Sequence, residues 1–207
     1  AEGCATVKLA TAGRICPITS GPIASHQFFN YRHVIPGLWY PGTGTRSCAA
    51  SYKWYRDIFG TDEFRIAEEK GTSAYEVLNR AAEAVPAGSE KLYFHPYLLG
   101  EMTPYYDDKL RASFVGAGMH HTKGHFTRAV MEGISYSMRD CLEEIKAQKI
   151  AVSEYRIIGG GAKGKLWRQI LADVVTPIPE NVEIYEKGFK DYRTIQKALA
   201  EVYHDII

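Results

Sequence analysis

Hydrophobic and polar positions alternate over the first 45 residues of the chain, and glycine and proline interrupt the pattern at short intervals. Four β-prone runs stand in this region: "ATVKLATA", "RICPIT", "FFNYRHVI" and "LWYPG". Turn residues punctuate them at Gly13, Gly21-Pro22, Pro36-Gly37 and Pro41-Gly42. Alternation with a period of two is typical of half-buried strands. The region is therefore predicted to be a β-meander.

After residue 45 the apolar positions recur every three or four residues, which is the spacing of an amphipathic helix. Helices are predicted over residues 49–59, 73–85, 122 to about 148, 165–174 and 181–207. Helix 49–59 has four large apolar residues on or near one face, Tyr52, Tyr55, Ile58 and Phe59. Helix 73–85 begins with capping-box spacing between Ser73 and Glu76. Helix 181–207 carries one long apolar stripe, so it must lie against another part of the protein: Tyr185, Phe189, Tyr192, Ile195, Leu199, Val202 and Ile206.

The longest predicted helix, 122–148, has two kinds of stripe. Large apolar residues recur along it at Phe126, Val130, Ile134, Met138, Cys141 and Ile145. A second row holds the small residues Ala129, Gly133 and Ser137. Small residues in a row allow another backbone to approach closely. This helix is therefore expected at the centre of the core.

The remaining segments complete an α/β pattern. "KLYFHPYLLGE" is a short apolar run, "SFVGAG" is strand-like, and "EYRIIGGG" is predicted to be a buried strand that runs into a turn. Strands that alternate with helices after an initial meander indicate one α/β domain over residues 1–207, with a mixed sheet flanked by helices.

Charge and composition exclude several classes of function. The 207 residues carry 25 basic and 24 acidic side chains, a formal charge of +1, which gives no field for nucleic acid or an anionic membrane. No apolar stretch approaches the roughly 20 residues of a membrane helix. The first residues, "AEGCATVKLA", lack the features of a signal peptide, so a cytoplasmic location is expected. The four cysteines include no C-x-x-C pair and are expected to be reduced and structural.

The loop "GGGAKGK" at residues 159–165 fits the beginnings of two nucleotide motifs. A P-loop requires Ser or Thr after the lysine, and Leu166 stands there. A dinucleotide fingerprint requires a second strand that ends in an acidic residue, but "TPIPENVE" indicates a turn and a helix start. Two interpretations stay open from spacing alone: a small-residue loop that admits a flat or anionic ligand, and a tight turn without a ligand.

Four segments, in order, resemble the FGGY family of carbohydrate kinases. "RIIGGGAKGKLWRQILADV" resembles the family's adenosine-binding loop, most closely in its D-xylulose kinase branch, and "FHPYLLGEMTPYYDDKLRASFVGAG" resembles its "HPY-L-GERTP" stretch. "VKLATAG" resembles its "LGTSG" hairpin, and "SCAASYKWYRDIFG" a helix beside it. The resemblance implies an actin-like ATPase (ribonuclease H-like) fold and identifies the chain as similar to the second, nucleotide-binding lobe.

The implied reaction is transfer of a phosphoryl group from ATP, with Mg²⁺, to a sugar hydroxyl, with D-xylulose or a similar ketopentose as the expected substrate. Gly160, Gly161 and Ala162 match positions that pack against the adenosine. Thr11, with the turn at Ala12 and Gly13, matches the hairpin that reaches the terminal phosphates. Two further matches are less direct: Ala49 near the phosphates and Lys165 near the nucleotide. The implied partners are ATP, a small sugar and the kinase's N-terminal lobe, with a homodimer as a possible assembly.

Some family features are missing from the sequence. The catalytic aspartate of the family lies in a segment before the position of Ala1, so no catalytic residue is assigned here. The family's Gly/Ala-rich stretch before the closing helix is also missing. Two interpretations of this junction stay open: a missing stretch near residues 179–180, and two helices joined directly by a Pro-rich turn. The chain is therefore expected to be part of a longer kinase. The alternatives are a kinase for another sugar (ribulose, gluconate or glycerol) and a non-catalytic actin-like nucleotide-binding or interaction module.

Four other groups of residues are of types that can carry chemistry, but each is interpreted as a structural or surface feature. His120, His121 and His125 include an i, i+4 pair, but with no H-E-x-x-H and no further ligand in view they are interpreted as helix-start histidines, and no metal site is predicted. Asp107 and Asp108 are assigned to a solvated loop. Glu101 is expected near the cleft, although Met102 stands where the family has arginine. The aromatics around it, assigned to core packing rather than to a sugar-stacking wall, are Tyr93, Phe94, Tyr97, Tyr105 and Tyr106.

Overall fold

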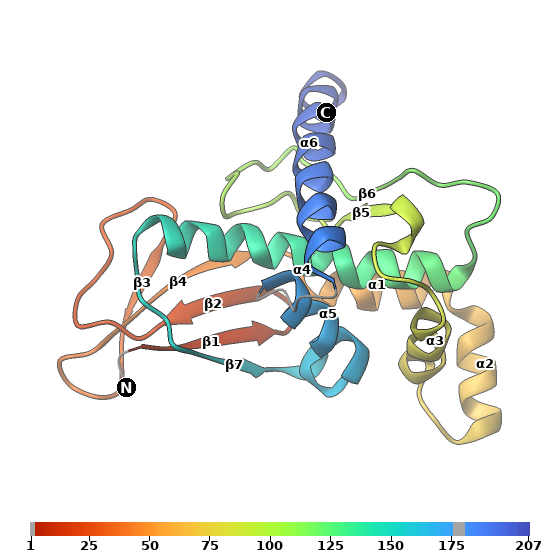
Figure 1. The fold of residues 1–207 in the computed structure, drawn as a ribbon, viewed down its shortest axis with the longest axis horizontal. Helices are drawn as coiled ribbons and strands as arrows, with labels where there is room; N and C mark the ends of the chain where they lie inside the picture. The colour runs from red at the N-terminus through yellow and green to blue at the C-terminus, as the bar shows by residue number, and fades with distance from the viewer. Residues whose placement is uncertain (1–2, 176–180) are drawn as a thin grey trace.

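A five-stranded mixed sheet, with a long helix lying across it, forms the frame of the protein in a computed structural model that describes residues 3–175 and 181–207 (Figure 1). The strands of this sheet are β1 (Cys4–Leu9), β2 (Gly13–Pro17), β3 (Phe29–Arg32), β4 (Trp39–Thr45) and β7 (Glu154–Ile158). A separate pair consists of β5 (Tyr93–His95) and β6 (Ser113–Val115). The helices are α1 (Ala49–Phe59), α2 (Thr61–Lys70), α3 (Ala74–Glu83), α4 (Lys123–Ala147), α5 (Lys165–Val175) and α6 (Val182–Ile206), with the short 3-10 turns η1 (Ser89–Lys91) and η2 (Gly160–Lys163).

The first four strands form where they were predicted, but they are not a meander. The strand order is β3-β4-β2-β1-β7, so β4 lies beside β2 and β3 lies at the edge. Residues 18–28 join β2 to β3, and a connection of this length does not fix the two strands as a tight hairpin. β4 can therefore take the position next to β2, where Gly42 and Gly44 allow close contact with Cys16 and with the backbone of Gly13.

The prediction of a buried strand is wrong for β7. This strand pairs in parallel with β1, from Cys4 opposite Glu154 to Lys8 opposite Ile158, and lies at the edge of the sheet. Only Tyr155 and Ile157 turn partly inward, while Ile158 is 44% exposed. The run "YRII" has the high β propensity of an interior strand, but propensity does not report how many faces are covered.

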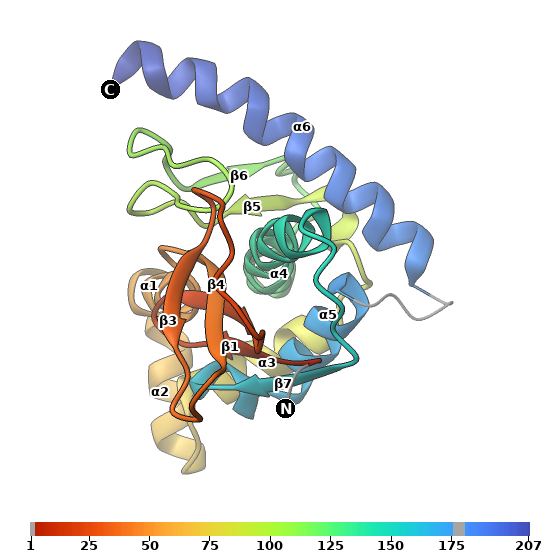
Figure 2. The ribbon, with the colours of Figure 1, turned by 90° about the vertical axis from the view of Figure 1, so that its left-hand side faces the viewer.

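The core lies on both sides of α4, as predicted for the longest helix. Figure 2 shows α4 almost end-on, between the five-stranded sheet and the β5/β6 pair, with α6 outside that pair. The row of small residues has the expected effect: at Gly133 an added Cβ would overlap the carbonyl oxygen of Phe94 in β5. Of the five aromatics assigned to core packing, Phe94 and Tyr97 are 1% exposed, which confirms the assignment for them, but Tyr106 is 49% exposed and the assignment is wrong for it.

The other predicted helices form as expected, with differences at their surfaces. Ser73 caps α3 and its hydroxyl accepts a hydrogen bond from the amide of Glu76 at 3.2 Å. In α1 the face prediction fails at its end, because Ile58 is 55% and Phe59 47% exposed. α2 was not predicted. The stripe of α6 is buried only along its first half, and its last members, Val202 and Ile206, are 49% and 70% exposed.

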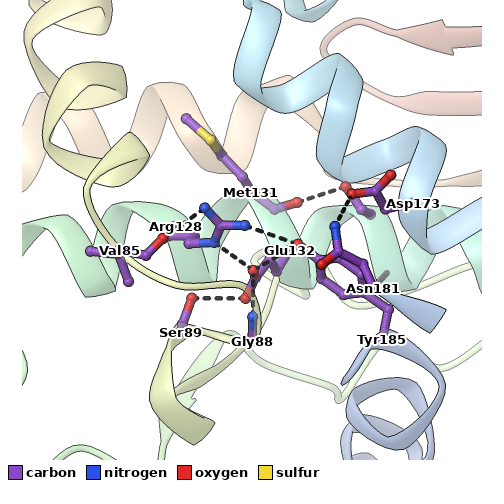
Figure 3. A network of polar contacts seen from close by, with 10 residues as sticks. Val85, Gly88, Ser89, Arg128, Met131, Glu132, Asp173, Asn181 and Tyr185 are labelled. Atoms are coloured by element: carbon purple, nitrogen blue, oxygen red, sulfur yellow. Dashed lines mark hydrogen bonds and ion pairs between the residues drawn. The ribbon is translucent and has the colours of Figure 1, made fainter. Parts of the chain in front are cut away.

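A buried polar network fixes the beginning of α6 and the turn η1 to α4 (Figure 3). The Glu132 carboxylate accepts hydrogen bonds from the Gly88 amide at 2.9 Å, the Ser89 hydroxyl at 2.8 Å, Arg128 Nε at 2.8 Å and the Tyr185 hydroxyl at 3.2 Å. Arg128 also donates to the Val85 carbonyl at 2.9 Å. Residues from three segments, η1, α4 and α6, thus meet at one carboxylate.

Two general expectations can be compared with the fold. Cys4, Cys16, Cys48 and Cys141 are free cysteines, as predicted. Across the described helices, none has both the length and the hydropathy required to cross a lipid bilayer. The candidate gap at residues 179–180 lies outside the described residues.

Candidate functional site

Three segments that are distant in the sequence meet at the carboxyl ends of the parallel strands β1 and β7. The turn between β1 and β2 lies against the beginning of α1: the Cys48 amide donates to the Thr11 carbonyl at 2.9 Å and the Ala49 amide to the Ala10 carbonyl at 2.8 Å. The glycine loop follows β7 and reaches the end of β1 at Leu9. In open α/β sheets, ligands bind outside the carboxyl ends of the strands.

The glycines of the loop serve different purposes. Gly159 has φ +100°, and a Cβ there would overlap the Leu9 carbonyl, so backbone and contact both require glycine. At Gly161 a Cβ would lie 2.8 Å from Trp167 Cζ3 and 2.9 Å from Leu9 Cβ, so this residue permits α5 to pack closely. Gly160 faces open space, with nothing within 4 Å of an added Cβ. The surface at Gly160 is therefore free for a ligand.

A cavity of about 430 Å³ opens over this loop, between α1, α3 and α5. Its lining residues are Ala49, Tyr52, Ser73, Tyr75, Glu76, Asn79, Gly160, Gly161, Lys163, Gly164 and Trp167. The volume is in the usual range of small-molecule sites. Of the residues singled out in the sequence, Ala49, Gly160 and Gly161 line the cavity, while Ala162 and Lys165 are neighbours in the loop that do not.

The hairpin residues lie outside this cavity. The turn at Thr11 and Ala12 joins β1 to β2, and the Thr11 side chain is exposed. Gly13 is buried, and a Cβ there would come 2.6 Å from Thr45 Cγ2, so its glycine is a packing requirement. Because the hairpin contacts the Ala49 end of α1, it adjoins the cavity wall. The structure thus places these three residues beside the cavity.

One wall of the cavity was missed by the sequence reasoning. α3 contributes Ser73, Glu76 and Asn79, spaced three residues apart and therefore on one helix face. This polar row was visible in the sequence as the face opposite the apolar stripe. Its position over the glycine loop depends on tertiary packing and could not be predicted from spacing.

Aromatic contacts make the wall rigid. The Tyr52 ring meets Trp167 edge-on at 5.6 Å and Tyr75 at 5.1 Å between centroids. The Tyr52 hydroxyl donates to Asn79 Oδ1 at 2.8 Å, and burial raises its pKa well above the usual value, so it stays a neutral donor. With Asn79 Oδ1 occupied in this way, the amide group is held in a fixed orientation at the cavity.

Glu101 is not at this cavity. Its carboxylate is fully buried and accepts hydrogen bonds from Thr45 Oγ1 at 2.6 Å, Ser137 Oγ at 3.2 Å and the amides of Arg46 and Met102 at 2.8 and 2.7 Å. Burial raises its pKa, and these four donors oppose the rise. Glu101 therefore ties β4, α4 and its own loop together, which is a structural role.

The two loop aspartates differ: the Asp108 side chain is 78% exposed, in agreement with a solvated loop, whereas the Asp107 side chain is only 18% exposed. Asp107 pairs with His204 at 2.7 Å, and Asp108 with Arg46. The hydrogen bond from His204 and those from the amides of Lys109 and Leu110 hold the pKa of Asp107 below its usual range, against the opposing effect of partial burial.

An α/β domain with a glycine-floored cavity at the carboxyl ends of parallel strands is an arrangement typical of nucleotide-binding domains. Comparison with known proteins gives the family. Residues 10–184 match the model of the C-terminal domain of the FGGY family of carbohydrate kinases, and the chain belongs to this family.

Curated relatives within the family have two names. The chain is 36% identical over 174 residues to "Xylulose kinase" of Lactococcus lactis subsp. lactis (strain IL1403), an alignment that covers 78% of this chain and 32% of the relative. It is 32% identical over 188 residues to "Gluconokinase" of Bacillus licheniformis, covering 88% of this chain and 36% of the relative. The chain thus spans about a third of the length of these relatives.

Solved structures agree on the fold. A xylulose kinase from Rhodospirillum rubrum superposes with a TM-score of 0.87 at 21% identity, covering 99% of this chain and 49% of the other. Gluconate kinase from Lactobacillus acidophilus gives a TM-score of 0.81 at 24% identity, with 100% and 49% covered. The fold is the actin-like ATPase fold of these kinases, as expected from the sequence.

Proposed function

We propose that this chain is the ATP-binding lobe of a sugar kinase that converts D-xylulose to D-xylulose 5-phosphate. The observation that carries the proposal is the cavity of about 430 Å³ whose floor is Gly160 and Gly161 and whose wall is aromatic and polar. A flat base fits between a glycine floor without side chains and the rings of Tyr75 and Trp167. The Nδ2 amide of Asn79, whose Oδ1 is held by the Tyr52 hydroxyl, suits a ligand with hydrogen-bond acceptors on its edge.

In this proposal the nucleotide runs from the cavity toward the β1–β2 hairpin. Gly160, Gly161 and the neighbouring Ala162 border the adenosine. Ala49 lies near the phosphates, and the Thr11 hydroxyl with the amides of Ala12 and Gly13 receives the terminal phosphates. Lys165, at the beginning of α5, adds positive charge near the nucleotide. These groups position the phosphates and stabilise negative charge, which is most of what phosphoryl transfer requires of a protein.

Mg²⁺ would accompany ATP and neutralise charge on its phosphates. Glu76 is the one acidic residue that lines the cavity in the described part of the chain, and it pairs with Arg80 at 3.4 Å. Mg²⁺ is commonly held by phosphates with one or two carboxylates. The lobe thus offers no dedicated ligand in this cavity, and the ion is assigned to the phosphates and to the other lobe.

The proton-accepting aspartate and most of the sugar pocket are assigned to an N-terminal lobe, which is the expected partner of this chain. A second copy of the chain is a further candidate partner, which light scattering of the full-length protein tests. A cytoplasmic location and a role in xylose use belong to the same proposal.

The substrate is tested by turnover of the full-length protein that carries this chain. ADP release is measured with D-xylulose, D-ribulose, gluconate and glycerol at equal concentrations, and D-xylulose is expected to give the highest kcat/KM. A preference for gluconate would instead support the second candidate, which rests on the similarity to a gluconokinase. ATP binding without turnover on any sugar would favour a non-catalytic nucleotide-binding module.

The site is tested by Gly160→Val. Because Gly160 has open space around it, the new side chain projects toward the ligand and leaves the packing intact, whereas Gly161→Val would also collide with Trp167 and Leu9. Gly21→Val is a matched control, since an added Cβ at Gly21 also has nothing within 4 Å and Gly21 is not among the residues that line the cavity. ATP affinity, measured by calorimetry, is expected to fall about 10-fold or more in Gly160→Val, or about 1.4 kcal/mol. Equal affinity in the two variants would refute the assignment of the loop.

A further inference from the structure

A second group of potential ligand residues lies away from the nucleotide cavity, where the turn η1 meets the segment before α4. Glu90, His120 and His121 each offer one ligand atom, and these atoms all lie within 4.8 Å of one another. Glu90 Oε2 is 3.6 Å from His120 Nε2 and 3.2 Å from Nε2 of His125, which lies one turn further along. The fold thus supplies the carboxylate that the histidine cluster lacks in the sequence.

We propose that Glu90, His120 and His121 bind a divalent transition metal, with zinc as the preferred ion. Two imidazoles and a carboxylate are a ligand set that zinc accepts, and the fourth position of a tetrahedron is left to water. Ligand atoms about 2.0–2.1 Å from zinc are roughly 3.3 Å apart. The Glu90–His120 separation of 3.6 Å is close to that value, so small side-chain rotations complete the site.

The backbone presents Glu90 at a conformational cost. Ser89, Glu90 and Lys91 are consecutive residues without a glycine, and all three have positive φ, at 46°, 50° and 70°. Such backbone persists only where the surroundings hold it. Here the buried Glu132 does so through the Gly88 amide and the Ser89 hydroxyl, as Figure 3 shows. Glu90 is therefore fixed beside the histidines.

The histidines are also positioned. The His120 and His121 rings lie 4.0 Å apart between centroids. His120 packs over Gly118, where a Cβ would come 2.9 Å from its Cε1. His125 is a positioning residue: its Nδ1 accepts from the Thr122 amide at 3.1 Å, so its Nε2 carries the hydrogen and donates to Glu90. A hydrogen bond of this kind orients a ligating carboxylate and raises metal affinity.

One ring nitrogen of His121 has no hydrogen-bond partner within the described residues. Its Nδ1 accepts from the Gly118 amide at 2.8 Å, so the neutral ring carries its hydrogen on Nε2, and Nε2 is buried without a hydrogen-bond partner. Buried polar atoms without a partner are uncommon. Metal binding at Nε2 moves the ring hydrogen to Nδ1 and gives up the hydrogen bond from the Gly118 amide, a loss that the bond to the metal must outweigh.

Zinc itself is the probe for the test. The metal-stripped full chain is titrated with Zn²⁺ by calorimetry, in competition with a chelator of known affinity, and one ion per chain is expected. Glu90→Gln, His120→Ala and His121→Ala remove ligands, and each is expected to weaken binding about 100-fold or more, since loss of an outer partner alone costs about 10–100-fold. His125→Ala should fall in that smaller range. His26→Ala, at an exposed histidine outside the cluster, should bind zinc as the unaltered chain does.

Two further measurements separate ligation from folding. Circular dichroism of the metal-free variants is expected to match that of the unaltered chain, because the three side chains are on or near the surface. Co²⁺ bound to the unaltered chain should give the visible spectrum of a tetrahedral nitrogen–oxygen site, and Glu90→Gln should change it. Binding of clearly less than one zinc ion per chain, or equal zinc affinity in Glu90→Gln and His26→Ala, would overturn the proposal. The cluster would then be a set of histidine–glutamate pairs.

Discussion

Replacing Glu132 by glutamine is expected to destabilise the protein severely. The change removes the negative charge that faces Arg128, whose Nε lies 2.8 Å from Glu132 Oε1. Both side chains are almost completely buried, with 10% of the Arg128 side chain and 3% of the Glu132 side chain exposed. Removing one partner of a buried pair leaves the other charge without compensation, at a cost of about 3–5 kcal/mol.

An exposed ion pair of the same spacing serves as a control, because it separates the effect of burying the charges from the general effect of a mutation. Arg65 and Glu69 are also four residues apart on a helix, at 2.8 Å, but their side chains are 64% and 58% exposed. Exposed pairs of this spacing contribute about 0.3–0.5 kcal/mol. Glu69→Gln is therefore expected to change the free energy of unfolding about tenfold less than Glu132→Gln.

The assay is equilibrium unfolding in guanidinium chloride, which gives the free energy of unfolding of each variant. The double variant Arg128→Met, Glu132→Gln should recover part of the loss, because no unpaired charge then remains buried. The reasoning fails if Glu132→Gln lies within about 1 kcal/mol of the unaltered protein, or if the double variant is less stable than the single one.

Three further predictions concern packing, pH and capping. Gly133→Ala should destabilise the protein by at least about 1–3 kcal/mol in the same assay, because its methyl group would overlap the Phe94 carbonyl, and a neutral or stabilising effect would contradict the close approach of α4 and β5. Burial raises the pKa of Asp140 to about 7, so between pH 4 and 7 the folded state binds more protons than the unfolded state and this residue lowers stability as pH rises. Asp140→Asn should therefore reduce the pH dependence of the free energy of unfolding and increase that free energy at pH 8. Unfolding midpoints equal to those of the unaltered protein at both pH 5 and pH 8 would count against this. Ser73→Ala should cost about 1 kcal/mol by loss of the hydrogen bond to the Glu76 amide and should also weaken ATP binding, since Ser73 lines the cavity; a stability loss without an affinity change would remove Ser73 from the nucleotide site.

Local periodicity predicted where most helices begin and end, but it did not predict which faces of the helices and strands are buried. The bounds of α1, α4 and α5 follow from the spacing of apolar residues, and the start of α3 follows from its capping residue Ser73; both signals are local in sequence. The exposure of Ile58, Phe59 and Val202 does not, because the covering of a helix face depends on elements that are distant in the chain. The burial of β7 was wrong for the same reason.

The candidate site shows the same division. The glycine loop is a local signal and could be found from its sequence and resemblance. The wall formed by Ser73, Glu76 and Asn79 required the packing of α3 over η2, which spacing does not encode. Glu90 likewise lies 30 positions before His120 in the sequence, and only the fold brings its carboxylate to the histidines.

The parallel pairing of β1 with β7 has a consequence for how the protein is made. Cys4 lies opposite Glu154 although the two are 150 positions apart in the chain. A ribosome that has completed the β1–β2 hairpin must therefore add residues 18–153 before β7, the strand that pairs with the other side of β1, emerges. Pairings of such long range are slow to form, and an uncovered strand invites wrong pairing while it waits. The glycine loop that forms the floor of the cavity follows β7 directly, so the cavity should form only after this long-range pairing.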